Sequence, residues 1–442
     1  MFDGYSIASG STDITPQARI PLAGYSALRK ATFERVADPL EANVIVLRRG
    51  VDAVVFVAFD LMYVGAFLRD GIVKALSGRI PRESIFASAG HTHSGPPTED
   101  SLPILGTVSP EYRDSVVRSV SELALRLLDG PFVPVTLEYL EGNASHSVNR
   151  RKKVFGLSRN YPFIGPHVGI EPNLSGRRDD TIRMIRIRDG SGKDVAACWS
   201  YACHPVGFPR LNDLSAEYPG VVRHMIRASF GNIPIVFWQG FSGNIGPLRA
   251  THMAGSPASQ VTYGFEAATM EEWNAWASGL GDCVAGTALG RGRPVQGPIS
   301  CSVRALSLHE LGLSSSSEKQ LRLHEIRLGR DLVICGLNAE VAVEYVEIFR
   351  ELHAPAHVIP VGCVGDVFGY LPVDEMVREG GYEAKGFLRR FGLRGKFFPN
   401  VSEIVTERLF RDAQKTEQSK AQGETTDQRG AGAAERDSSA AH

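Results

Sequence analysis

The sequence predicts an α/β protein in which helices pack on mixed β-sheets within a single large domain, residues 1–412. Short segments rich in β-branched and aromatic residues alternate with longer segments of helical periodicity, and this alternation is typical of the α/β class. Of the 442 residues, 43% are hydrophobic and 22% are charged, which is a composition able to bury a large core.

The expected elements follow from these local patterns, and no internal repeat is visible. Strands are expected at residues 43–47, 53–59, 85–88, 135–139, 181–187, 196–202, 235–238, 321–328, 332–337 and 357–361. Helices are expected at residues 64–75, 110–128, 218–229, 270–289 and 341–352.

Two segments have the composition of loops or tails. Small and polar residues dominate residues 255–266, which predicts a loop that could act as a lid. From about Ala413 the chain is rich in Gln, Ser, Thr, Gly and Ala, so residues 413–442 are expected to be disordered.

The charge balance argues against binding to nucleic acid. The formal net charge is -1, and the one basic strip, Asn149-Arg150-Arg151-Lys152-Lys153, is too short to form an electrostatic footprint. No transmembrane segment is expected, because no run approaches the roughly 20 apolar residues that a membrane helix requires. The opening residues lack a signal-peptide pattern and the six cysteines are scattered, so we expect reduced thiols and a cytoplasmic protein.

Two histidines follow the expected strand 85–88, in the run Gly90-His91-Thr92-His93-Ser94-Gly95-Pro96. Side chains alternate along an extended backbone, so His91 and His93 should point the same way. Neutral imidazole is the commonest metal ligand and also an acid or base near neutral pH. The pair by itself is compatible with a metal site or with two solvent-facing loop histidines.

Two further candidates stand where a buried strand ends. His204 follows the strand 196–202, and Glu340 follows the strand 332–337. Active sites of α/β folds favour such positions. Taken alone, His204 could be a hydrogen-bonded core histidine, and Glu340 could simply favour the positive end of the following helix.

A glycine-rich turn and two loop tyrosines complete the set. The turn Gly240-Phe241-Ser242-Gly243-Asn244-Ile245-Gly246-Pro247 allows close approach of the backbone to a ligand, but it lacks the G-x-S-x-G spacing of a serine nucleophile. Tyr370 and Tyr382 lie in glycine-flanked loops, where they could pack as aromatics or bring a hydroxyl to a site.

Taken in order, these stretches resemble the catalytic domain of the neutral/alkaline (non-lysosomal) ceramidase family. The resemblance spans roughly residues 10–410 and is most specific from His91 to Pro96. Other matching pieces are Asp13-Ile14-Thr15-Pro16, Pro21-Leu22-Ala23-Gly24-Tyr25, Asp38-Pro39-Leu40, Phe59-Asp60-Leu61 and Asn149-Arg150.

The resemblance implies an amidase with one zinc ion per chain, held by His91, His204, Glu340 and Tyr370. Zinc lowers the pKa of a bound water toward ~7 and so supplies a hydroxide nucleophile. Asp60 is expected to orient one of the ligand histidines.

The same matching implies roles for residues around the metal. His93, Arg150 and Tyr382 are expected to bind the amide and to stabilise its oxyanion. Gly24, Asn244 and Gly246 are expected to contribute to substrate binding.

The chain also departs from the family pattern. Ceramidases carry G-D-x-S-P in the glycine-rich turn, whereas this chain has Gly243-Asn244-Ile245-Gly246-Pro247. A serine nucleophile cannot operate at Gly246, while a zinc-hydroxide mechanism is unaffected. The expected immunoglobulin-like C-terminal domain is also not seen, which favours an N-acyl or ester-like substrate smaller than ceramide.

Two classes of function remain open at this point. The first is a zinc amidohydrolase that cleaves an N-acylated small molecule or lipid, with esterase, lactonase or acyl transferase chemistry as variants on the same site. The second is a non-catalytic relative that binds an acyl ligand. The sequence does not determine the oligomeric state.

Overall fold

A computed structural model of the chain describes residues 4–25, 32–157, 164–251, 262–263, 268–315 and 318–411. The expected disordered tail, residues 413–442, lies outside the described residues. So does the expected loop 255–266, apart from Thr262 and Tyr263.

The larger of two principal sheets has nine strands and is mixed. Strands β4 and β5 are parallel, as are β10 and β12, while the other neighbours are antiparallel. Its order is β12 (Ile235–Gln239), β10 (Asp194–Tyr201), β9 (Thr181–Asp189), β6 (Val133–Asn143), β1 (Tyr5–Asp13), β3 (Glu41–Arg49), β4 (Asp52–Phe59) and β5 (Ile85–Ala89), and β16 (Arg293–Val295) also pairs with β6.

The second sheet has four strands and packs face to face on the first. Its order is β17 (Ile299–Ser307), β19 (Gln320–Leu328), β20 (Leu332–Leu337) and β22 (His357–Val361), of which β20 and β22 are parallel. Alternate side chains of each strand enter different cores, as the strand pleat requires. Phe56 and Ile334 lie in the core between the sheets, whereas Val55 and Val333 belong to an outer core.

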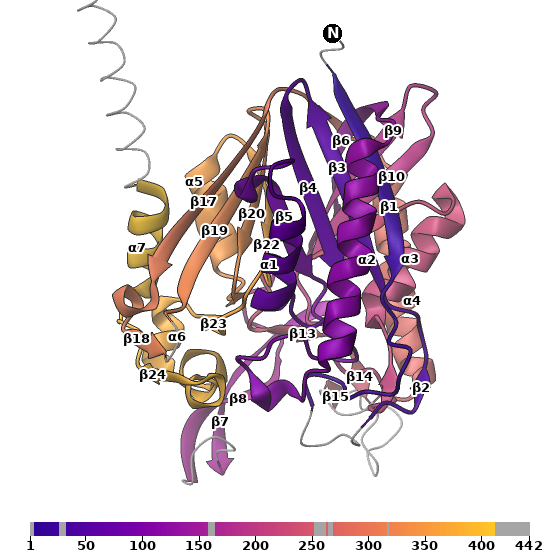
Figure 1. Cartoon of the computed structure of the whole chain (residues 1–442). Helices are drawn as coiled ribbons and strands as arrows, with labels where there is room; N and C mark the ends of the chain where they lie inside the picture. The colour runs from indigo at the N-terminus through magenta and orange to yellow at the C-terminus, as the bar shows by residue number, and fades with distance from the viewer. Residues whose placement is uncertain are drawn as a thin grey trace, which may run out of the picture.

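Helices cover the outer faces of this sandwich (Figure 1). Helices α1 (Gly65–Ala75) and α2 (Pro110–Asp129) share an apolar core with β3 and β4, and α3 (Glu217–Phe230) and α4 (Met270–Ala288) share another with β9, β10 and β12. Helix α5 (Tyr345–His353) packs on the outer side of the second sheet. No helix among the described residues is long and apolar enough to cross a membrane.

Shorter elements surround the ends of the two sheets. An antiparallel hairpin of β7 (Ser147–Leu157) and β8 (Ile164–Asn173) projects beyond the body and pairs with β13 (Ile245–Pro247) (Figure 1). The other short strands are β2 (Arg35–Val36), β11 (Asp213–Leu214), β14 (Ala250–Thr251), β15 (Thr262–Tyr263), β18 (Leu313–Ser315), β21 (Glu340–Val341), β23 (Tyr370–Leu371) and β24 (Leu393–Gly395). Short helical segments are α6 (Asp374–Glu379), α7 (Val401–Thr406), Arg82–Ser84, Pro103–Leu105, Leu308–Leu311, Tyr382–Gly386, Leu388–Phe391 and Glu407–Arg411.

The predicted fold class is confirmed, and each expected strand and helix overlaps an observed one. One boundary is wrong: residues 340–341 form the strand β21, and α5 begins only at Tyr345. The sequence patterns missed β1, β7, β8 and β17. Polar and glycine residues interrupt the apolar runs of these strands, and the β7–β8 hairpin is largely exposed beyond Arg151.

Candidate metal centre

The candidate residues His91, His204 and Glu340 lie just beyond the carboxyl ends of strands from both sheets, the two histidines in loops and Glu340 in the short strand β21. His91 follows β5, His204 follows β10, and Glu340 follows β20. Each of these strands has a parallel neighbour, so several carboxyl ends open on the same side of the sandwich. Loops beyond such strand ends are the usual place for a binding crevice in α/β proteins.

His91, His204 and Glu340 converge at one buried point. The Nε2 atom of His204 lies 3.0 Å from Oε2 of Glu340, and Nε2 of His91 lies 3.5 Å from the same oxygen. The two imidazole rings are 4.9 Å apart. All three residues are buried, so segments far apart in the sequence bring two nitrogens and a carboxylate to one point inside the protein.

Backbone carbonyls hold both imidazoles in one tautomer. Nδ1 of His91 lies 3.0 Å from the Met62 carbonyl, and Nδ1 of His204 lies 2.7 Å from the Ser242 carbonyl. A carbonyl oxygen can only accept, so each Nδ1 carries the hydrogen and each Nε2 presents a lone pair toward Glu340. Three acceptors facing one another require a cation between them, either a proton or a metal ion.

The charge state of the cluster agrees with this requirement. Burial, helped by Arg150, lowers the pKa of His204 to about 4, so this ring is neutral. Burial alone would raise the pKa of Glu340, but the two histidines outweigh it and hold the pKa well below its usual range. Burial would likewise lower the pKa of His91, but Cys363 and Glu340 raise it well above its usual value. The ionised Glu340 thus carries a negative charge for a cation to balance.

Two tyrosines complete the surroundings of the carboxylate. The hydroxyl of Tyr63 donates a short hydrogen bond to Oε1 of Glu340. Tyr370 is paired with Glu340 in the β21–β23 ladder and hydrogen bonds to its carboxylate. Burial and then the charge of Glu340 raise the pKa of both phenols. The sequence interpretation missed Tyr63, although it follows β4 as His91 follows β5.

Arg150 and Tyr382 both contact Tyr370. Nη2 of Arg150 donates to the Tyr370 hydroxyl at 3.3 Å, and Nε of Arg150 donates to Oε1 of Glu383 at 2.9 Å. Oε2 of Glu383 accepts from Nη1 of Arg151, also at 2.9 Å. The rings of Tyr370 and Tyr382 lie 5.3 Å apart. Glu383, which no sequence pattern singles out, therefore fixes the orientation of Arg150.

His93 lies on another side of the same centre. Its ring is 5.0 Å from that of His91 and 6.0 Å from that of His204, and one nitrogen from each ring lies within 4.8 Å of the others. His93 is thus close enough to share a metal with His91 and His204, in addition to Glu340 and Tyr370. Gly24 packs on it: a Cβ at Gly24 would lie 2.7 Å from Nδ1 of His93, and the φ of +89° also requires glycine.

Asn244 and Gly246 border the site through their backbone. The carbonyl of Asn244 accepts from the Arg150 amide at 2.8 Å, and its side chain binds Glu344 and the Val343 amide. Gly246 pairs with Val148 in the β13–β7 ladder. The hydroxyl of Ser242 accepts a hydrogen bond from Gln239, and the backbone carbonyl of Ser242 accepts one from Nδ1 of His204.

The expected role of Asp60 is wrong. Its Oδ2 accepts from the Glu41 amide at 2.8 Å and from Nη1 of Arg223 at 2.7 Å, not from a ligand histidine. Backbone carbonyls perform the orienting role instead, and a sequence does not reveal which carbonyls those are.

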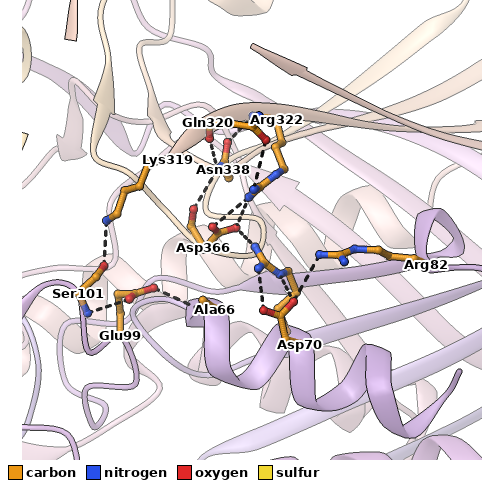
Figure 2. A network of polar contacts seen from close by, with 11 residues as sticks. Ala66, Asp70, Arg82, Glu99, Ser101, Lys319, Gln320, Arg322, Asn338 and Asp366 are labelled. Atoms are coloured by element: carbon orange, nitrogen blue, oxygen red, sulfur yellow. Dashed lines mark hydrogen bonds and ion pairs between the residues drawn. The ribbon is translucent and has the colours of Figure 1, made fainter. Parts of the chain in front are cut away.

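A polar network includes Asn338 and Asp366, which are close in sequence to residues of the site (Figure 2). Asn338, two positions before Glu340, donates to the carbonyls of Gln320 and Asp366 at 2.9 Å each. Both carboxylate oxygens of Asp366 accept from Nη1 of Arg322, at 2.8 and 2.9 Å. Asp366 follows Cys363 by three positions, and the carbonyl of Cys363 accepts from the amide of Ala89, at the end of the strand before His91, at 3.1 Å. The network therefore ties the loops of Glu340 and His91 to the second sheet.

Comparisons with known proteins agree with this architecture. No protein-family model and no curated protein sequence matches the chain. Among solved structures, neutral ceramidase from Pseudomonas aeruginosa matches with a TM-score of 0.71 and 16% identity, over 92% of this chain and 73% of that one. A ceramidase complexed with C2 matches with the same score and identity, over 92% and 74% of the two chains. The resemblance read from the sequence is thus confirmed at the level of the fold: the chain adopts the fold of the neutral ceramidases.

Proposed function

We propose that the protein is a zinc-dependent hydrolase that cleaves the amide bond of an N-acylated small molecule or lipid. The observation that carries the proposal is the buried convergence of His91, His204 and Glu340, whose facing atoms are all acceptors. The likeness of fold to ceramidases supports amide hydrolysis as the reaction class.

The donor set fits zinc. Two imidazole nitrogens with a carboxylate form a common protein ligand set for catalytic zinc, and Tyr370 would add a phenol oxygen. The Nε2 atom of His91 is buried and has no hydrogen-bond partner among the described residues, which is what a metal-ligating nitrogen requires. When bound, zinc would supply a hydroxide nucleophile near neutral pH.

Residues of the chain would perform the remaining tasks. Arg150, held by Glu383, and the Tyr382 hydroxyl would donate hydrogen bonds to the amide oxygen as it gains negative charge. His93 would carry a proton to the departing nitrogen. In the overall reaction the oxygen of water bonds to the acyl carbon, the C–N bond breaks and the amine leaves with the proton.

The substrate is proposed to be lipid-like. The matched structures are described as ceramidases, one of them complexed with C2, which makes an N-acyl compound the first class to test. We propose a shorter or more polar compound than ceramide, because Asn244 and Gly246 replace the Asp and Ser of the ceramidase turn.

The decisive experiment combines metal analysis with a substrate panel. Purified protein should contain close to one zinc per chain and should hydrolyse at least one member of a panel of N-acyl amides. His204→Ala should lose both zinc and activity, whereas His224→Ala, on the exposed side of α3, should keep both. Metal-free wild-type protein that turns over amides would refute the zinc mechanism. Zinc-loaded protein that binds acyl compounds without cleaving amides or esters would establish a non-catalytic binding protein instead.

A further inference from the structure

A buried arginine lies beside the loop that follows the candidate ligand His204. Arg249 is only 4% exposed and lies two positions after the end of β13. Its guanidinium packs against Gly207, where a Cβ would lie 2.9 Å from Cζ. Gly207 follows His204 by three positions, and the carbonyl of Pro205 between them accepts from the His93 amide at 3.4 Å.

Arg249 has few partners within the described part of the chain. Among the described residues, its one hydrogen bond runs from Nη1 to the Gly207 carbonyl at 3.1 Å, and its Nε has no partner. Other buried arginines differ: Arg223 pairs with Asp60 at 2.7 Å, and Arg183 pairs with Asp179 at 2.6 Å. A buried guanidinium without a paired carboxylate among the described residues is costly, so this placement favours an anionic partner such as a bound carboxylate.

The groups that face Arg249 do not neutralise it by direct contact. Burial lowers its pKa, while Glu217, Tyr25 and Glu272 act on it electrostatically and raise it. Among the described residues no carboxylate forms an ion pair with Arg249, and Oε1 of Glu217 accepts from the Ser94 hydroxyl at 3.0 Å. The ring of Tyr25 lies 5.3 Å from the ring of His93, so its action on Arg249 places Arg249 on the His93 side of the centre.

We propose that Arg249 binds a carboxylate of the substrate, so that the preferred substrates are N-acylated amino acids rather than neutral N-acyl amides. This inference rests on the proposed amide hydrolysis and narrows its substrate class. A guanidinium presents a planar fork of N–H donors that matches the two oxygens of a carboxylate. Placed next to the His93 loop, this fork would orient an amide whose carboxylate lies a few bonds from the scissile nitrogen.

The test compares two substrates that differ only in the anionic group, N-dodecanoylglycine and N-dodecanoylethanolamine. Zinc-loaded wild-type protein should prefer the glycine conjugate in kcat/KM by roughly 10- to 100-fold, the range of a charged hydrogen-bonded pair. Arg249→Met should bring the ratio of the two kcat/KM values close to one. Arg249→Lys should keep part of the preference, because it retains the charge without the fork. Arg350→Met, on the exposed face of α5, is the matched control and should leave the ratio unchanged.

The outcomes separate this inference from the proposed function. If neither compound is hydrolysed, amide hydrolysis of this class fails, and the same ratio is then measured as dissociation constants by calorimetry. In either measurement, a wild-type protein that does not favour the glycine conjugate overturns the carboxylate assignment. A folded Arg249→Met variant, checked by circular dichroism, that keeps the wild-type ratio also overturns it.

Discussion

Glu340 and Tyr370 occupy directly paired positions in the parallel β21–β23 ladder, although α5 and β22 lie between them in the chain. The amide of Glu340 donates to the Gly369 carbonyl at 2.9 Å, and the amide of Ala342 donates to the Leu371 carbonyl at 3.0 Å. This short ladder therefore holds the carboxylate and the phenol on one side of the backbone, where both reach the proposed metal.

Tyr370→Phe should weaken zinc binding because it removes the phenol oxygen while keeping the ring in its apolar surroundings. We expect a loss of zinc affinity on the order of 10- to 100-fold, comparable to the loss of a group that supports a metal site. Competition with a chelator of known affinity measures it. Tyr382→Phe is the paired variant and should keep zinc while lowering kcat by about 100-fold, the effect of one oxyanion donor. Equal zinc affinity in Tyr370→Phe and wild type would remove Tyr370 from the ligand set.

Glu383→Ala should destabilise the fold as well as the reaction. The substitution leaves Arg150 and Arg151 without the carboxylate that both contact, and breaking a buried pair of this kind costs about 3–5 kcal/mol. Urea unfolding followed by fluorescence gives the free energy of unfolding. Glu347→Ala, which removes an exposed pair with Arg350, should change it by less than about 1 kcal/mol. Similar free energies of unfolding for the two variants would show that the ion pairs of Glu383 with Arg150 and Arg151 do not stabilise the fold.

Ser242→Ala should leave most of the activity. The hydroxyl of Ser242 accepts a hydrogen bond from Gln239, and Gln239 keeps a second bond to the Cys203 carbonyl at 2.8 Å. The expected cost is about 1 kcal/mol of stability, since only one hydrogen bond is lost. Initial rates at saturating substrate measure the effect. A complete loss of activity in a folded, zinc-loaded variant would point to a serine nucleophile.

The stability of the fold should fall steeply in acid because of Glu325. Burial would raise the pKa of this carboxyl, but the hydrogen bond to His353 and attraction from Arg304 and Arg327 lower it to about 2. Because the pKa of Glu325 is lower in the folded state than the unfolded value of ~4.3, the ionised carboxylate stabilises the fold above that pH. This stabilisation is lost as the pH falls toward 2.

The variant Glu325→Gln tests this linkage. Its free energy of unfolding at pH 7 should be about 2–3 kcal/mol lower than that of wild type. Between pH ~5 and ~2 its free energy of unfolding should change less than that of wild type. Urea midpoints measured across that range give the comparison. Burial lowers the pKa of His324 to about 4, so the stability of the variant should still depend to some extent on pH in this range. Parallel pH profiles in variant and wild type would contradict the assignment.

The sequence by itself determined the class of fold and most of its elements. Apolar runs such as residues 53–59, and helical periodicity such as residues 110–128, are local signals because burial acts on neighbouring residues in a repeating way. Polar strands such as β1 and β7 lack that signal, and only their pairing with other strands makes them regular. The sequence also indicated His91, His204 and Glu340, because each follows a recognisable strand and matches a family motif in order.

Tertiary structure alone decided which isolated side chains complete the centre. Tyr63 and Cys363 stand in loops and Glu383 in the short helical segment Tyr382–Gly386, all without a repeating pattern. They reach the site only because distant strand ends meet there. The carbonyls that orient the two imidazoles, and the absence of a carboxylate partner for Arg249 among the described residues, are likewise properties of the packed chain. Local periodicity encodes secondary structure, whereas the convergence of single polar groups depends on contacts between residues far apart in sequence.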